Sequence, residues 1–194
     1  MKLTFEPISH KYYLDGQEIP GVSELLTLTG YLQPQYYNAT SHKMARGTLV
    51  HLLIHEHETI GIPTLDDEMG PWLEAYFTFK LLNKFRCLAS EARGYNVDPV
   101  FAGTADLVGK IGPAKYVVDL KTGTKASWHR LQVAAYAIIH NVSHAGILYL
   151  RESKKGIVPK FEVIRDLDQA KAEFLTIAKR AVDTWQYNKQ EVYT

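Results

Sequence analysis

The chain has 194 residues, of which 46% are hydrophobic and 22% charged, and its formal net charge is +1. This composition is that of an ordinary globular protein. The net charge excludes an overall basic excess that would attract nucleic acid. The single cysteine, Cys87, excludes an internal disulfide framework and any four-cysteine metal site. No apolar run approaches the ~18–20 residues of a membrane span, and the N-terminus has no apolar signal core, so we expect a cytoplasmic protein.

The first part of the chain is expected to form a strand, a hairpin and three helices. Alternating residues at 3–8 predict a strand, and Asp15-Gly16 is a favoured hairpin turn. Helices are expected at 22–29, from about 40 to Gly61, and from Pro71, which suits a first helical turn, to residue 85. Residues 31–39 read as a loop, so residues 1–39 are predicted to be a hairpin and helix that lead into the main fold.

The second part is rich in β-strand signals. Strands at 87–97, 100–111 and 115–121 are expected to form a meander, the last two joined by a Gly112-Pro113 turn. Ser127 is expected to cap a helix over 128–140, strands follow at 146–152 and 157–165, and Asp168 opens a final helix. No repeat or linker divides the chain. We therefore predict one α/β domain over 1–194, with a central mixed β-sheet flanked by helices.

The segment VVDLKTG, residues 117–123, places Asp119 and Lys121 on one face of a strand, because side chains alternate along it. Antiparallel pairing around Gly112-Pro113 would bring Asp106 close to Asp119. Two carboxylates repel unless a hard cation such as Mg²⁺ or Mn²⁺ lies between them. Such a cation activates water and neutralises charge on a phosphodiester, and Lys121 would stabilise the developing charge. The alternative is an ordinary surface ion pair between Asp119 and Lys121.

Further candidate site residues accompany Asp106, Asp119 and Lys121 in the sequence. Gln132 and Tyr136 lie four residues apart on the predicted helix and so share a face, although a lone tyrosine there would usually be core. His51, on an earlier helix, offers a nitrogen ligand, and by itself it would be a half-buried histidine. Glu91, on the first strand of the meander, is a further acid within reach of a metal or its water shell.

These motifs, in this order, resemble the PD-(D/E)xK nuclease superfamily, and within it the RecB-type exonucleases, which include phage exonucleases and the mitochondrial genome maintenance exonuclease. The resemblance runs from about residue 40 to 140 and rests on GTLVH at 47–51, Glu91, GTAD at 103–106, DLK at 119–121 and QVAAY at 132–136. It implies a restriction-endonuclease-like core and an exonuclease that uses one or two Mg²⁺ or Mn²⁺ ions. The substrate would be DNA, as single strands or duplex ends, in recombination, repair or replication, in the cytoplasm of a bacterial or phage-infected cell. A recombination or replication protein is a further candidate partner. The oligomeric state stays open.

The resemblance also implies roles for single residues. His51, Asp106 and Asp119 would hold metal together with the Leu120 carbonyl, and Lys121 would be the catalytic lysine. The role of Glu91 varies across the superfamily, and we count it with the catalytic acids. The DNA contacts expected, some from the resemblance and some from their charge or aromatic character, are Gln132, Tyr136, Arg46, Lys125, Trp128 and Arg130.

Four other interpretations stay open at this point. The fold could be a DNA-binding module with an inactive site, or an endonuclease of the same superfamily. His51 and His55, one helical turn apart, could instead bind zinc. The N-terminal tyrosines, at positions 12, 13, 31, 36 and 37, could cover the site as a flap or simply pack on the sheet. An iron–sulfur member of the family is excluded, because only Cys87 is available.

Overall fold

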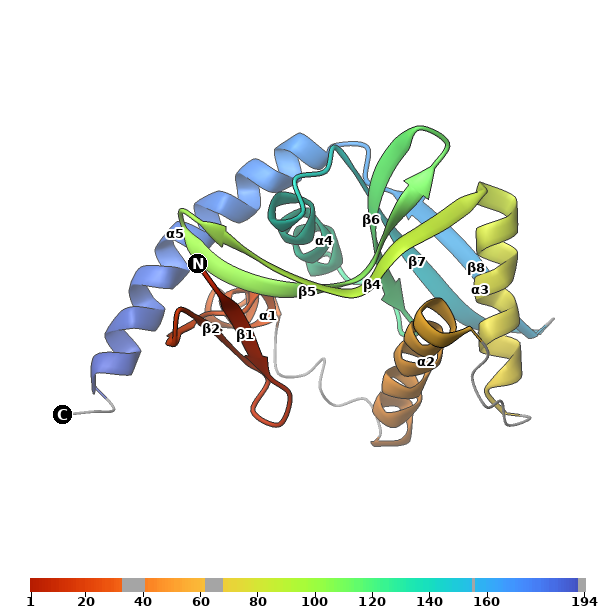
Figure 1. Cartoon of the computed structure of the whole chain (residues 1–194), viewed down its shortest axis with the longest axis horizontal. Coiled ribbons are helices and arrows are strands. Elements are labelled where there is room, and N and C mark those ends of the chain that lie inside the picture. The colour runs from red at the N-terminus through yellow and green to blue at the C-terminus, as the bar shows by residue number, and fades with distance from the viewer. Residues whose placement is uncertain (33–40, 62–67, 155, 192–194) are drawn as a thin grey trace.

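A computed structural model describes residues 1–32, 41–61, 68–154 and 156–191 of the chain. Two β-sheets organise these residues: a three-stranded sheet in the order β1-β2-β3 and a five-stranded sheet in the order β4-β5-β6-β7-β8 (Figure 1). None of the helices in the described ranges has an apolar stretch long enough to cross a bilayer.

The small sheet is formed by the N-terminal residues. Its antiparallel strands are β1 (Leu3–Glu6), β2 (Lys11–Leu14) and β3 (Gln17–Ile19), and the Asp15-Gly16 turn joins the last two as predicted. The first strand is shorter than the predicted 3–8, because a turn at residues 7–10 ends it. Helix α1 (Val22–Leu28) follows and ends before Gly30, which has a left-handed φ of 76°. The predicted loop beyond Leu32, with Tyr36 and Tyr37, lies outside the described residues.

The large sheet is mixed. Strands β4 (Phe85–Val97), β5 (Val100–Ile111) and β6 (Ala114–Lys121) form the predicted antiparallel meander. Strand β7 (His144–Ser153) runs parallel to β6, and β8 (Gly156–Val163) runs antiparallel to β7. The central strands are almost continuously apolar because both faces of the sheet are covered. This confirms the predicted α/β fold with a mixed sheet flanked by helices.

Helices cover both faces of the large sheet (Figure 1). Helices α2 (Ser41–Ile60) and α3 (Gly70–Asn83) pack on one face, with Tyr76, Phe79 and Leu120 in that core. Helices α4 (Trp128–Ile139) and α5 (Leu167–Glu191) pack with α1 on the other. Ser127 does precede α4, but its side chain makes no capping hydrogen bond. The two sheets meet where Gly21, just before α1, forms a β-bridge with Ala102 of β5.

Candidate active site

Three acidic residues lie side by side on three neighbouring strands. Ser90 is opposite Leu107 and Ala92 opposite Ala105 in the β4–β5 register, which brackets Glu91 and Asp106 as a pair. Leu107 is opposite Val118 in the β5–β6 register, so the next step along places Asp106 opposite Asp119. The antiparallel pairing predicted around the Gly112-Pro113 turn therefore brings the carboxylates together.

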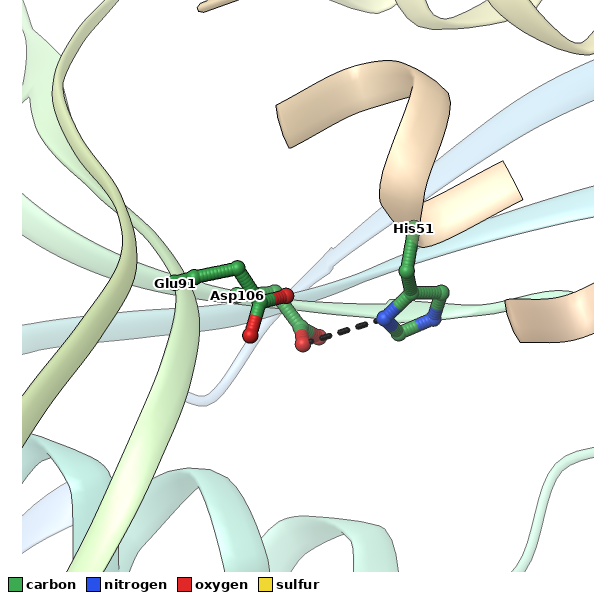
Figure 2. Close-up of side chains that lie close together, drawn as sticks. All are labelled: His51, Glu91 and Asp106. Carbon is green, nitrogen blue, oxygen red and sulfur yellow. Dashed lines mark hydrogen bonds and ion pairs between the residues drawn. The ribbon is translucent and has the colours of Figure 1, made fainter. Parts of the chain in front are cut away.

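Glu91 reaches this row through an unusual backbone. Its φ is 50°, in the left-handed region that side-chain-bearing residues seldom adopt. A β-bulge between Cys87 and Ala89 lies just before it in the same strand. Bulges re-aim side chains, and strain of this kind persists only where the surrounding structure holds it. The carboxylate of Glu91 is directed towards Asp106 (Figure 2).

Helix α2 brings a histidine to the same place. Figure 2 shows His51 projecting from its helix towards Asp106, and its Nδ1 donates to Asp106 Oδ1 at 3.1 Å. The other oxygen of Asp106, Oδ2, accepts a hydrogen bond of 2.6 Å from the backbone N–H of Leu120. The Asp106 carboxylate is therefore held by α2 on one side and by β6 on the other.

These residues form a cluster that fits a metal ion. One ligand atom each from His51, Glu91 and Asp106 lies within 4.8 Å of the other two. Carboxylates suit Mg²⁺ and Mn²⁺, and an imidazole nitrogen is also a common ligand of first-row metals. Among the described residues no other group of histidine, cysteine and acidic side chains meets this criterion. Asp119 is outside the cluster, and His55 bonds to Ser90 Oγ at 3.0 Å instead of sharing a site with His51.

Asp119 and Lys121 form an ion pair beside the cluster. Lys121 Nζ lies 2.7 Å from Asp119 Oδ2, and the Asp119 side chain is only 2% exposed. The Trp128 ring lies against the same amine, 5.6 Å from its centroid to Nζ. The ammonium group is therefore held between an acid and an aromatic face, one step along the strand from the acidic row.

The electrostatics of the cluster favour a bound cation. Burial alone would raise the pKa of Asp106, but His51, Lys121 and the Leu120 amide lower it below its ordinary value. Burial would lower the pKa of His51, yet its contact with Asp106 raises it. Burial raises the pKa of Asp119 to about 6, although Lys121 acts against that rise, and burial followed by the charge of Asp106 raises the pKa of Glu91. The carboxylates repel one another, and added positive charge would relieve that repulsion.

A cavity of about 440 Å³ opens onto the acidic row. Of the predicted site residues it is lined by His51, Glu91, Asp106, Asp119, Lys121, Gln132 and Tyr136. Gln132 Nε2 donates to the Tyr136 hydroxyl at 3.1 Å, and both side chains are buried. The Tyr136 ring lies against Gly103. Leu120 does not line the cavity, since its side chain is in the core.

Four predicted DNA contacts lie outside the cavity. Arg46 pairs with Glu152 at 2.6 Å, Lys125 with Glu162 at 2.5 Å, and Arg130 with Asp166 and Glu173 at 2.9 and 2.7 Å. Trp128 packs on Lys121. The sequence reasoning also missed His10 and Lys11, which line the cavity beside Tyr12. These three residues belong to the N-terminal wall of the cavity. The Asp15-Gly16 hairpin, which fixes the alternation of the two strands, is the signal that could have indicated this wall.

Comparisons with known proteins show similarity to exonuclease structures at low identity. No protein-family model and no curated protein matches the chain. LHK-Exo in complex with dAMP has a TM-score of 0.49 at 10% identity, over 90% of this chain and 91% of that one; LHK-Exo is an alkaline exonuclease from Laribacter hongkongensis. A phage-related exonuclease of Haemophilus somnus 129PT has a TM-score of 0.42 at 12% identity, over 88% and 96%.

A further solved structure, SSO0001, has a TM-score of 0.37 at 15% identity, and the match covers 58% of this chain and 56% of that one. The chain thus spans little more than half the length of SSO0001. Likenesses of this size assign no activity to the chain.

Proposed function

We propose that the protein is a metal-dependent DNA exonuclease of the PD-(D/E)xK superfamily, RecB-type branch, that hydrolyses phosphodiester bonds. The observation that carries the proposal is the row of Glu91, Asp106 and Asp119 on three adjacent strands, with His51 on one side and Lys121 on the other. Carboxylates in register beside a lysine suit phosphodiester hydrolysis, because that reaction needs both a cation site and a separate positive charge.

His51, Glu91 and Asp106 would hold the cation, Mg²⁺ or Mn²⁺, and Asp119 and the Leu120 carbonyl lie next to them in the strand order. When bound, the cation would lower the pKa of a water molecule and neutralise phosphate charge. Lys121 would stabilise the negative charge that develops on the phosphate. Asp119 and Trp128 hold the Lys121 amine in place, so its position is set before substrate arrives.

Gln132 and Tyr136 supply the polar wall on the α4 side of the cavity. They would contact the DNA strand whose phosphate lies over the acidic row. Arg46, Lys125 and Arg130 are engaged in ion pairs with acidic partners. A role for these three in DNA binding would require DNA phosphates to replace those partners, so we expect it to be secondary.

The test is a cleavage assay with matched variants. End-labelled single-stranded, duplex and closed circular DNA would each be incubated with Mg²⁺, Mn²⁺ or EDTA. Asp106→Asn and Lys121→Met should lower the rate by about 100-fold or more, the usual loss when a charge-stabilising group is removed. Lys115→Met is the control, because Lys115 is exposed at the far end of the same strand. Thermal melting would establish that all three variants fold.

The outcomes separate the alternatives. Metal-dependent loss of linear DNA alone, abolished in Asp106→Asn and Lys121→Met, supports the exonuclease. Cutting of the closed circle would make the protein an endonuclease. Intact DNA in every lane, together with tight DNA binding, would favour an inactive binding module. Full activity in both variants would remove the acidic row from the reaction and refute the proposal.

A further inference from the structure

Glu91 takes its place in the cluster through its backbone alone. Asp106 is held by two hydrogen bonds, whereas the Glu91 carboxylate has no hydrogen bond or ion pair with any of the described residues. Its direction towards Asp106 (Figure 2) is therefore set by a backbone with a φ of 50°. Such a conformation persists at a residue other than glycine only where the surrounding structure holds it. The contacts of the residues before and after Glu91 thus decide where its carboxylate lies.

Strand β4 changes faces at Glu91. In a regular strand the residues before and after it would share one face of the sheet, because side chains alternate. Here Ser90 contacts α2 on one face, while Ala92 packs into the core beside α4 on the other. The paired residues of β5 make the same change, since Leu107 is in the α2 core and Ala105 in the α4 core. The left-handed φ of Glu91 therefore lies at the point where the strand passes from one core to the other.

Helix α2 holds the residue before Glu91. His55 Nδ1 lies 3.0 Å from Ser90 Oγ. His55 is one helical turn after His51, whose ring bonds to Asp106. One helix therefore holds Asp106 on β5 and Ser90 on β4 together.

Helix α4 holds the residue after Glu91. Its C-cap residue, His140, donates from Nε2 to the Ala92 carbonyl oxygen at 3.1 Å. Burial lowers the pKa of His140, so the ring is neutral and its single proton lies on Nε2. The end of the helix lies close to β4, because a Cβ placed on Gly94 would be 3.5 Å from His140 Cε1. The ring is therefore packed against the strand whose carbonyl it binds.

We propose that His55 and His140 are positioning residues, which hold the backbone on either side of Glu91 so that its carboxylate completes the cation cluster with His51 and Asp106. The inference rests on the proposed function, because it concerns the cation of that same site. Without either contact, Glu91 relaxes to an ordinary strand conformation and its carboxylate turns away from Asp106. The site then loses a ligand and binds its cation more weakly.

The test measures Mn²⁺ binding to the whole protein by isothermal titration calorimetry, without DNA. Ser90→Ala removes the contact with α2, and His140→Leu removes the contact with α4. Each should weaken Mn²⁺ binding by about tenfold or more, the usual effect of removing a group that orients a metal ligand. His140→Gln, whose side-chain N–H can still donate to the Ala92 carbonyl, should restore most of the affinity.

The matched controls come from a similar contact outside the cluster. Ser143 Oγ lies 3.0 Å from His144 Nδ1, and neither residue lines the cavity. Ser143→Ala and His144→Leu should bind Mn²⁺ like wild type. Thermal melting should show that every variant folds, and if His140→Leu does not, Ser90→Ala decides the inference.

A double-mutant cycle shows whether His140 acts through Glu91. Glu91→Gln alone should weaken Mn²⁺ binding, and the addition of His140→Leu should then weaken it no further. A further loss of about tenfold in the double variant would mean that His140 acts on the cation by another route, and the inference would be wrong.

DNA cleavage by the same proteins separates this inference from the proposed function. Wild-type Mn²⁺ affinity and full cleavage in Ser90→Ala and His140→Leu would overturn the inference and leave the nuclease function intact. No cleavage by wild type, together with the expected cycle of Mn²⁺ affinities, would count against the nuclease function alone. Absence of Mn²⁺ binding by wild type would overturn both.

Discussion

At the scale of single residues, the surroundings of His129 show how the site is kept rigid. His129 is the second residue of α4, and its side chain is buried. Its Nδ1 lies 3.2 Å from the Tyr149 hydroxyl and 3.4 Å from the Ala126 backbone N–H. Both groups donate to the ring only while that nitrogen carries no proton. A neutral His129 therefore ties the segment after Lys121 to β7.

This contact makes stability depend on pH. Burial, followed by the charges of Lys121, Arg151 and Lys125, lowers the pKa of His129 to about 3, against an unfolded value of ~6.5. Because the folded pKa is the lower one, the stabilisation is complete above pH ~6.5 and is lost as the pH falls towards 3. At pH 5 the loss should be about 2 kcal/mol from this residue, as each pKa unit corresponds to ~1.36 kcal/mol.

The measurement is urea denaturation of wild type and His129→Gln at pH 7.5 and pH 5. Glutamine keeps a polar group but does not protonate, so the variant should lose clearly less stability between the two pH values. Other titrating groups contribute equally to both proteins, and the difference between them isolates His129. Identical pH dependence in the two proteins would mean that His129 can be charged in the folded state.

At the scale of elements, the packing of α4 on β5 sets the position of the polar wall. Strand β5 passes beneath α4 at Gly103, where an added Cβ would lie 2.8 Å from Tyr136 Cε1 and 3.1 Å from Val22 Cγ2. A side chain there would push away either the helix that carries Gln132 or the helix α1 that supports the N-terminal wall. The glycine is therefore needed for close approach and not for a turn.

Gly103→Ala should lower the free energy of unfolding by about 1–3 kcal/mol, the usual cost of overpacking a core. It should also reduce DNA cleavage, because Tyr136 must shift. Gly123→Ala is the matched control, since nothing lies within 4 Å of a Cβ at that position, and its stability should change by no more than about 0.5 kcal/mol. Chemical denaturation checks both. Equal stability of the two variants would show that Tyr136 can move freely.

The elements were largely predictable from the sequence, and the site only in part. Alternation and apolar runs gave the strands of the meander, and the short Gly112-Pro113 connection forced the register that pairs Asp106 with Asp119. Long-range partners are what the sequence does not reveal. Arg46 and Lys125 looked free in the sequence, but their acidic partners lie 106 and 37 residues further along the chain. No local pattern predicts such pairs.

The place of Glu91 in the metal cluster was also beyond local reasoning. Its direction depends on a left-handed backbone after a bulge, and neither is encoded by a glycine or an asparagine at that position. The sequence placed an acid on the correct strand. The alternation of an ideal strand does not predict the direction of the Glu91 side chain, because the bulge and the left-handed φ change it. The expectation that Asp119 would be a direct metal ligand stays a prediction, since its carboxylate is engaged by Lys121.

At the scale of the whole molecule, the last helix holds the first residues. Helix α5 crosses α1 and reaches the small sheet (Figure 1). Trp185 Nε1 donates to Glu24 Oε1 at 2.8 Å, and Lys189 Nζ lies 2.7 Å from Glu18 Oε1. Trp185 is mostly buried in this contact. The N-terminal wall of the cavity is thus supported from behind by α5.

Trp185→Phe should keep an aromatic ring in place and remove the hydrogen bond to Glu24 Oε1, while Oε2 keeps its hydrogen bond from the Gly21 backbone N–H at 3.4 Å. The free energy of unfolding should fall by about 1–2 kcal/mol, the range for a hydrogen bond to a charged group. Thr176→Ala, an exposed position on the same helix, is the control and should change stability by no more than about 0.5 kcal/mol. Thermal and urea denaturation check the pair, and an unchanged Trp185→Phe would mean that α5 does not support the wall.

The support of the wall by α5 also sets an order of assembly on the ribosome. Chains emerge from the N-terminus, so the strands that carry His10 and Tyr12 are made long before Trp185 and Lys189. Until those late residues appear, α1 and the small sheet have their contacts with the large sheet but lack the hydrogen bond from Trp185 and the ion pair with Lys189. A nascent chain therefore has the acidic row and Lys121 before α5 supports the wall, and the cavity is completed only after residues 185–189 have been made.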